Sequence, residues 1–137
     1  MKVRWVVLCD FANMSKEGKL NLMGVFDQIT SKNYPAIHPS MFLVIRFDVD
    51  PAEFGHQQKI IVKLADEDGK KILEASAELT PNGEGGRGLY VDNVLALQNV
   101  VFPHEGRYSV DVLVNNNAQG HVGLNMLKAP ISAGPAQ

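Results

Sequence analysis

Apolar and polar residues alternate along most of the chain, which is the pattern of β-strands with one buried face. Gly, Pro, Asn and Asp interrupt this alternation at short intervals and mark turns between the strands. The pattern predicts an all-β fold, an antiparallel two-sheet β-sandwich of about eight strands, of the immunoglobulin-like, C2-like or jelly-roll-like kind. The predicted strands are Val3–Phe11, Lys19–Ile29, Met41–Val49, Lys59–Ala65, Leu73–Leu79, Leu89–Val101, Tyr108–Val114 and His121–Met126.

Three short segments predict hairpin turns between neighbouring strands. Residues 15–18 connect the first two strands, and Asp68-Gly69 supplies positive φ for a tight turn. Residues 115–117 are three asparagines, which tolerate left-handed backbone conformations. Leu73–Leu79 could also form a short amphipathic helix, but the turn before it favours a strand.

Proline and glycine positions indicate where the regular pattern breaks. Pro35 and Pro39 predict a long loop over residues 30–40 that crosses between the sheets. The alternation slips near Asp92-Asn93, which suggests a bulge there. Tyr108 follows a glycine corner and begins a strict alternation, as in sandwich strands whose aromatic ring packs inward while its hydroxyl bonds to the backbone.

The strand from Met41 to Val49 is apolar at nearly every position, which predicts a central strand covered on both faces. A chain of 137 residues has the size of one domain with one core. We expect that domain to span residues 1–128. Residues 80–88 and 129–137, rich in Gly and Pro, predict a flexible loop and a flexible tail.

Charge and cysteine content argue against several classes of partner and location. The net charge of −2 and the scattered Lys and Arg residues do not favour nucleic-acid binding. No apolar run is long enough to span a membrane, and no cleavable leader is evident. The single cysteine, Cys9, lies in an apolar stretch, so we expect a buried thiol and a reducing, cytoplasmic setting. No motif calls for a cofactor.

Acidic residues near two predicted turns suggest a calcium site. Asp48 and Asp50 follow one strand, and Asp66 and Asp68 follow the next. Calcium takes six to eight oxygen ligands, and sandwich domains supply them from neighbouring loops. The alternative is that these are ordinary turn residues that bond to their own backbone, since the spacing matches no EF-hand.

No catalytic motif is present, because the chain lacks GxSxG and any comparable nucleophile turn. Asp27 and Arg46 are charged residues in apolar strands, and a structural ion pair between them is a natural interpretation. His38 lies in the loop that two prolines stiffen. An enzyme would need an unrecognised acid/base pair, such as His38 with Asp27.

Several segments of the chain resemble a family of small bacterial β-domain proteins of unknown function. They are Leu8-Cys9-Asp10-Phe11-Ala12, Gly18-Lys19-Leu20, Gly24-Val25-Phe26-Asp27-Gln28-Ile29, Pro35-Ala36-Ile37-His38-Pro39 and Leu43-Val44-Ile45-Arg46. The resemblance implies a stand-alone bacterial β domain and carries no activity with it. It directs attention to His38, Asp27 and Arg46 as possible ligand-binding residues, although their place in the pattern could equally reflect the fold.

The sequence favours a non-enzymatic protein-interaction or assembly module, whose partner is another protein or a second copy of the chain. Trp5 and Val7 lie opposite Val6 and Leu8 on the first strand, so both faces of that strand are apolar and one could form an oligomer. The alternatives are a ligand- or calcium-binding sandwich domain and an enzyme of unrecognised chemistry.

Overall fold

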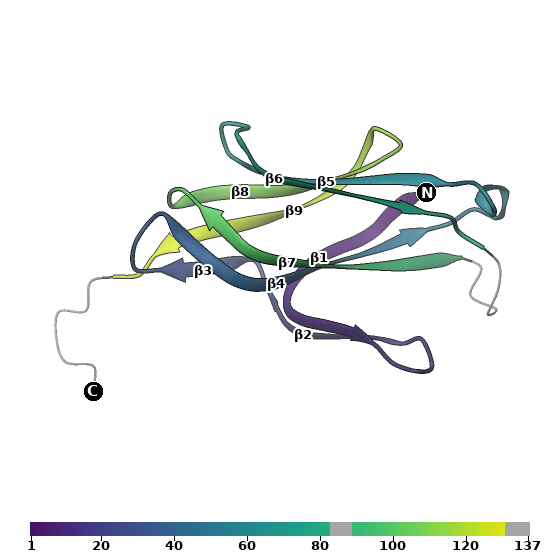
Figure 1. Cartoon of the computed structure of the whole chain (residues 1–137), viewed down its shortest axis with the longest axis horizontal. Helices are drawn as coiled ribbons and strands as arrows, with labels where there is room; N and C mark the ends of the chain where they lie inside the picture. Colours follow the sequence, from purple (N-terminus) through teal and green to yellow (C-terminus); the bar gives the residue numbers. More distant parts are fainter. Residues whose placement is uncertain (83–88, 131–137) are drawn as a thin grey trace.

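Two β-sheets packed face to face make up the fold in a computed structural model that describes residues 1–82 and 89–130 (Figure 1). The four-stranded sheet has the order β2-β1-β4-β7, and the five-stranded sheet has the order β3-β9-β8-β5-β6. Neighbouring strands are antiparallel except β3 and β9, which are parallel. The strands are β1 (Lys2–Met14), β2 (Leu20–Phe26), β3 (Gln28–Ser31), β4 (Ala36–Asp48), β5 (Gln58–Asp66), β6 (Lys71–Leu79), β7 (Tyr90–Phe102), β8 (Gly106–Val114) and β9 (Asn117–Lys128).

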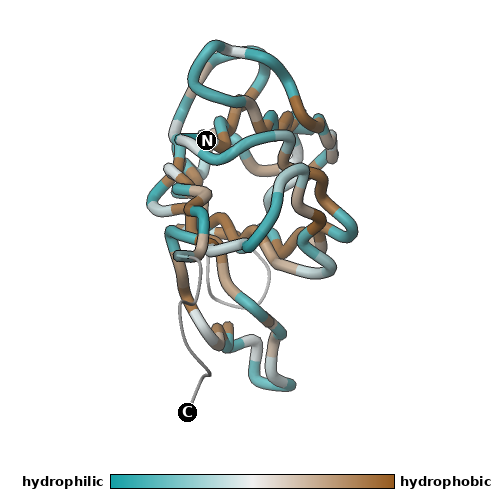
Figure 2. The backbone as a smooth tube through the Cα atoms, turned by 90° about the vertical axis from the view of Figure 1, so that its left-hand side faces the viewer, coloured by the Kyte–Doolittle hydropathy of each residue, from teal (hydrophilic) through white to brown (hydrophobic). Residues whose placement is uncertain are grey.

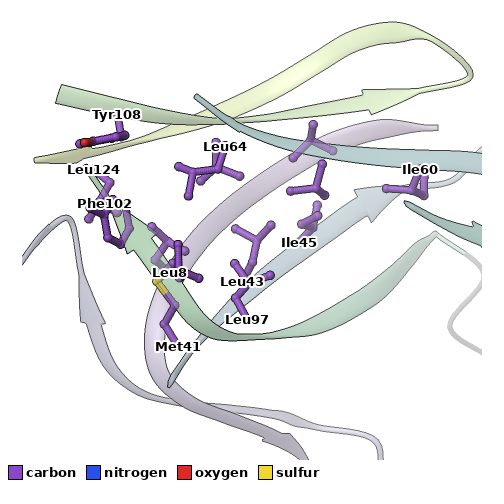
Figure 3. Close-up of a cluster of buried hydrophobic side chains, with 14 of the residues drawn as sticks. Leu8, Met41, Leu43, Ile45, Ile60, Leu64, Leu97, Phe102, Tyr108 and Leu124 are labelled. Atoms are coloured by element: carbon purple, nitrogen blue, oxygen red, sulfur yellow. The ribbon is translucent and has the colours of Figure 1, made fainter. Parts of the chain in front are cut away.

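The main core lies between the two sheets, where alternate residues of each strand point inward (Figure 3). Leu43, Ile45 and Phe47 of β4 are fully buried there. Leu64 of β5 and Leu124 of β9 face them from the other sheet. Strand β4 pairs with β1 on one side and β7 on the other, which confirms its prediction as the central, best-buried strand.

The predicted hairpin turns are confirmed. Gly69 joins β5 to β6 with a φ of 83°, and Asn115 and Asn116 join β8 to β9 with φ values of 51° and 69°. The segment from Lys71 to Leu79 is a strand rather than a helix. Tyr108 is buried, and its hydroxyl donates a hydrogen bond to the carbonyl oxygen of His104, as the corner pattern predicts.

The prediction of one strand over Lys19–Ile29 is wrong, because the chain changes sheets at Asp27. Strand β2 pairs with β1 in the four-stranded sheet, whereas β3 pairs with β9 in the five-stranded sheet. The described residues therefore form nine strands, close to the predicted number of about eight. Alternation alone could not reveal this change, since it continues through both strands.

The long crossing loop predicted over residues 30–40 is mostly strand, because β4 begins at Ala36 and includes both Pro39 and His38. Pro39 has no N–H to donate to β7, and the backbone of β7 is irregular at the residue opposite. Asn99 of β7 faces Pro39 and takes a φ of 53°. The bulge predicted near Asp92-Asn93 is wrong, since both residues keep a regular register with β4, and the irregularity lies at Asn99 instead.

Two predictions concern residues that the structure describes only in part. The flexible loop predicted over 80–88 lies outside the described residues from 83 onward, and the tail predicted over 129–137 does so from 131 onward. In the described ranges, 1–82 and 89–130, no helix has the length and apolar character of a membrane span.

Candidate functional site

The four carboxylates of the predicted calcium site lie at opposite ends of β5. Asp48 and Asp50 precede this strand, and Asp66 is its last residue. A strand of nine residues spans about 30 Å at roughly 3.3 Å per residue. The two acidic loops therefore cannot contribute ligands to one calcium ion. The prediction assumed that both loops lie at the same end of the sandwich, which the sequence does not establish.

Each of these carboxylates already has a local structural role or is exposed. Asp48 accepts a hydrogen bond of 2.5 Å from Nε of Arg4. Asp50 caps the short 3₁₀ helix Pro51–Glu53 by accepting from the amide of Ala52. Asp68 is exposed in its turn. Within residues 1–82 and 89–130, no group of three or more His, Cys, Asp and Glu side chains is arranged to hold a metal ion.

Asp66 is buried and organises the turn between β5 and β6. Its Oδ1 accepts hydrogen bonds from the amides of Asp68 and Lys70, at 3.0 and 2.8 Å. Its Oδ2 lies 3.3 Å from Nε2 of His104. The amide of Lys70 and then the His104 ring lower the pKa of the Asp66 carboxyl, while desolvation opposes them. This arrangement holds two loops together and needs no metal.

Arg46 pairs with Asp92 rather than with Asp27. Its Nε and one terminal nitrogen donate to the two carboxylate oxygens of Asp92 at 2.7 and 2.9 Å, which is the bidentate geometry of a strong ion pair. The guanidinium also lies over the Tyr90 ring, 4.1 Å from its centroid, and 5.2 Å from the centroid of Trp5. The Arg46 guanidinium is therefore held by one carboxylate and two aromatic rings.

Among the described residues, His38 and Asp27 are not joined by a hydrogen bond or an ion pair. His38 points into the end of the sandwich and contacts the Phe26 ring, with 6.1 Å between ring centroids. Its Nε2 is buried and lacks a hydrogen-bond partner among the described residues. Asp27 is exposed at the junction of β2 and β3, where its backbone carbonyl accepts from the amide of Asn125. Arg46 is thus paired with Asp92, whereas His38 contacts Phe26, the neighbour of Asp27 in the sequence.

A hairpin made by the end of β1 and by β2 extends beyond the sheet and forms a feature that the sequence analysis missed. Strand β1 pairs with β4 only as far as Cys9, and it then continues to Met14 with β2 as its sole partner. We call residues 10–26 the arm. Figures 1 and 2 show the arm beneath the four-stranded sheet, on the side away from the five-stranded sheet.

One side of the arm covers the outer face of the four-stranded sheet. Ala12 of the arm is buried in one cluster with Cys9 and Val44, which point outward from the sheet. Leu20 and Leu22 of β2 pack against the same cluster. Burial raises the pKa of the Cys9 thiol, as expected for an inert buried cysteine. The apolar outer face that suggested an oligomer is therefore covered in large part by the chain itself.

The other side of the arm remains apolar and exposed. Phe11 and Met23 are direct cross-strand partners, and Val25, which pairs with Cys9, is another exposed apolar residue of β2. Their exposed fractions are 47% for Phe11, 63% for Met23 and 59% for Val25. The Phe11 ring contacts the edge of Phe42, with centroids 5.4 Å apart, so the exposed patch is continuous with the sheet. Large apolar side chains are therefore grouped and exposed on this part of the arm.

The arm also carries an unpaired sheet edge, because β2 is the end strand of its sheet. From Leu20 to Phe26 this strand contains no charged residue and no proline. The end strands β6 and β7 both carry charged residues, and β3 has only 4 residues. Charges, prolines and short length are the devices that keep free edges from pairing. Among the described end strands of more than 4 residues, β2 is therefore the one without a charged residue.

These features define a two-sheet β-sandwich with an apolar arm and a free, uncharged edge strand. The family model described as "Family of unknown function (DUF6941)" matches residues 4–126, and the chain belongs to this family. A search of curated proteins found no match. The resemblance noted from the sequence is therefore confirmed at the level of the family.

Proposed function

We propose that this protein is a non-enzymatic interaction module whose partner is a polypeptide strand that pairs with the free edge of β2. The observation that carries the proposal is the combination of an uncharged free edge with the exposed Phe11, Met23 and Val25 side chains beside it. Main-chain hydrogen bonds supply affinity when a strand is added to a sheet edge, and neighbouring side chains supply specificity.

The other candidate residues support this proposal because their side chains already make contacts within the protein. The charged groups considered for catalysis or metal binding are engaged in local contacts, as with Arg46 and Asp92, or are separated from one another. The apolar side chains of Phe11, Met23 and Val25 on the arm remain 47%, 63% and 59% exposed. The proposal also keeps the bacterial cytoplasm as the setting, since the lone Cys9 thiol is buried and offers no disulfide.

A displayed library of random peptides, selected on the immobilised protein, tests the proposal. We expect selected peptides to be extended, apolar sequences, and we expect Met23→Lys to abolish their binding by placing a charge beside the edge. Ile37→Lys is the matched control, because Ile37 is 64% exposed but lies on β4, where it pairs with Val101 of β7 and is not next to β2.

Circular dichroism and thermal unfolding establish that both variants are folded. Loss of peptide binding in Met23→Lys with retention in Ile37→Lys supports the proposal. Peptides that bind both variants equally, or a library that yields no binder, overturn it.

A further inference from the structure

We infer that the strand that pairs with β2 is β2 of a second copy of this chain, in antiparallel register centred on Met23. This inference rests on the proposed function, because it names the partner of the same edge. A two-fold axis at Met23 makes each residue of one strand face the residue equally far from Met23 in the other. The register follows from the charges at the two ends of β2.

Lys19 and Asp27 lie four positions before and four positions after Met23, each one residue beyond an end of β2, and Asp27 is where the chain leaves for the other sheet. In the centred register, Lys19 of each copy faces Asp27 of the other, which gives two symmetry-related opposite-charge pairs. Both side chains are exposed, and neither forms an ion pair within residues 1–82 and 89–130. The segment between them is uncharged, so no like charges meet in this contact.

The side chains between the charges also match in this register. Residues directly opposite in an antiparallel pair share a face of the sheet. Leu20 then faces Phe26 of the second copy, and Met23 faces Met23. A shift by one residue would move every side chain to the wrong face and would separate Lys19 from Asp27.

One feature of β2 limits the strength of this pairing. Gly24 has a φ of 69°, which bends the strand next to its midpoint. Bent edges pair less readily than straight ones. The flanking Lys19 and Asp27 pairs therefore have a larger share in fixing the register, and we expect a reversible dimer that dissociates on dilution and weakens with salt.

Sedimentation equilibrium of the full chain with exchanged charges tests the inference. Lys19→Asp and Asp27→Lys each replace two attractive pairs by two repulsive ones, so each should raise the dimer dissociation constant roughly tenfold or more. The double variant, with both substitutions, restores opposite charges and should recover most of the wild-type affinity. Lys16→Asp makes the same charge change at the arm tip and serves as the matched control.

Disulfide cross-linking is an independent test of the two-fold axis at Met23. Met23→Cys places a cysteine opposite itself, at a spacing that a disulfide can bridge across an antiparallel pair. Mild oxidation should give a disulfide-linked dimer for Met23→Cys and none for Ile37→Cys. Wild-type chain that stays monomeric at all accessible concentrations overturns the inference, as does a double variant that remains as weak as the single ones.

These outcomes separate the inference from the proposed function. A monomeric chain that still binds selected peptides at Met23 would reject the second copy as the partner and keep the strand-accepting edge. A dimer that forms equally well in the Met23→Lys variant would show that the copies meet elsewhere and would overturn the inference.

Discussion

The hydroxyl of Tyr108 donates a hydrogen bond of 2.6 Å to the carbonyl oxygen of His104, four residues earlier in the chain. This bond closes the corner between β7 and β8, and the Tyr108 ring packs edge-on against Phe102, with 5.0 Å between centroids. One side chain thus joins the corner to the core. Its hydroxyl and its ring can be tested separately.

Tyr108→Phe keeps the ring and leaves the carbonyl oxygen of His104 without this donor. We expect the free energy of unfolding to fall by about 1 kcal/mol, the typical net contribution of one hydrogen bond. Urea unfolding followed by fluorescence measures the change. Tyr90→Phe is the control, because the Tyr90 hydroxyl makes no hydrogen bond in the described part of the chain, and an equal loss in both variants would contradict the prediction.

The contact between His104 and Asp66 makes stability depend on pH in two ranges. The Glu105 carbonyl and Asp66 raise the pKa of His104 above its ordinary 6.5, so its contribution is complete below that pH and is lost as pH rises through the raised pKa. Asp66 has a pKa below its ordinary 3.8, so its contribution is present above that pH and is lost as pH falls through the lowered pKa.

Melting temperatures of the wild type and His104→Gln across pH 4–9, taken at low salt, check the upper range. The wild type should lose stability relative to the variant above about pH 6.5, where His104 begins to deprotonate. A constant difference between the two proteins across this range would refute a role for protonated His104.

Arg46 and Asp92 provide a test of geometry at constant charge. Arg46→Lys keeps the positive charge but loses the bidentate hydrogen bonds to Asp92 and the stacking of the guanidinium on the Tyr90 ring. We expect about 1–2 kcal/mol lower stability, because the Asp92 carboxylate is nearly buried and loses a charged donor. Urea unfolding of Arg46→Lys, Asp92→Asn and the double variant gives the coupling between the residues. Additive losses would mean that the pair contributes no coupling.

Gly24 should tolerate no side chain, for two separable reasons. Its φ of 69° is unfavourable for other residues, and an added Cβ would lie 2.3 Å from Oδ2 of Asp10. Gly69→Ala is the matched control, because its φ is 83° and nothing lies within 4 Å of the added Cβ. We expect about 1–2 kcal/mol of backbone strain in both variants. Thermal unfolding should show a larger loss for Gly24→Ala, which Asp10→Ala partly restores.

Alternation and turn residues were sufficient to predict the strands whose environment is regular. Val110 and Val112 of β8 point inward as their spacing indicates, and the Gly69 and Asn115 turns lie where local chemistry places them. These features depend on neighbours close in the sequence. The prediction failed where distant partners decide the structure, as at Asp27, where alternation continues although the chain changes sheets.

The candidate site was harder to predict for the same reason. Arg46 and Asp92 are neighbours only because β4 and β7 pair in a particular register, which a single sequence does not reveal. The calcium hypothesis grouped Asp48 with Asp66, whereas Asp48 ends β4, before β5 begins, and Asp66 lies at the far end of β5. The arm did leave a signal, since Lys19 and Asp27 flank an uncharged apolar segment.

The parallel pair of β3 and β9 has a consequence for synthesis on the ribosome. It joins Gln28 to Asn125, so the segment next to the arm gains its sheet partner only when nearly the whole chain has been made. Pairings between such distant segments form slowly, and unpaired apolar strands on a nascent chain are prone to associate. During translation β3 therefore lacks its partner beside the free edge of β2, and rapid synthesis at high expression should favour aggregates that slower synthesis at low temperature avoids.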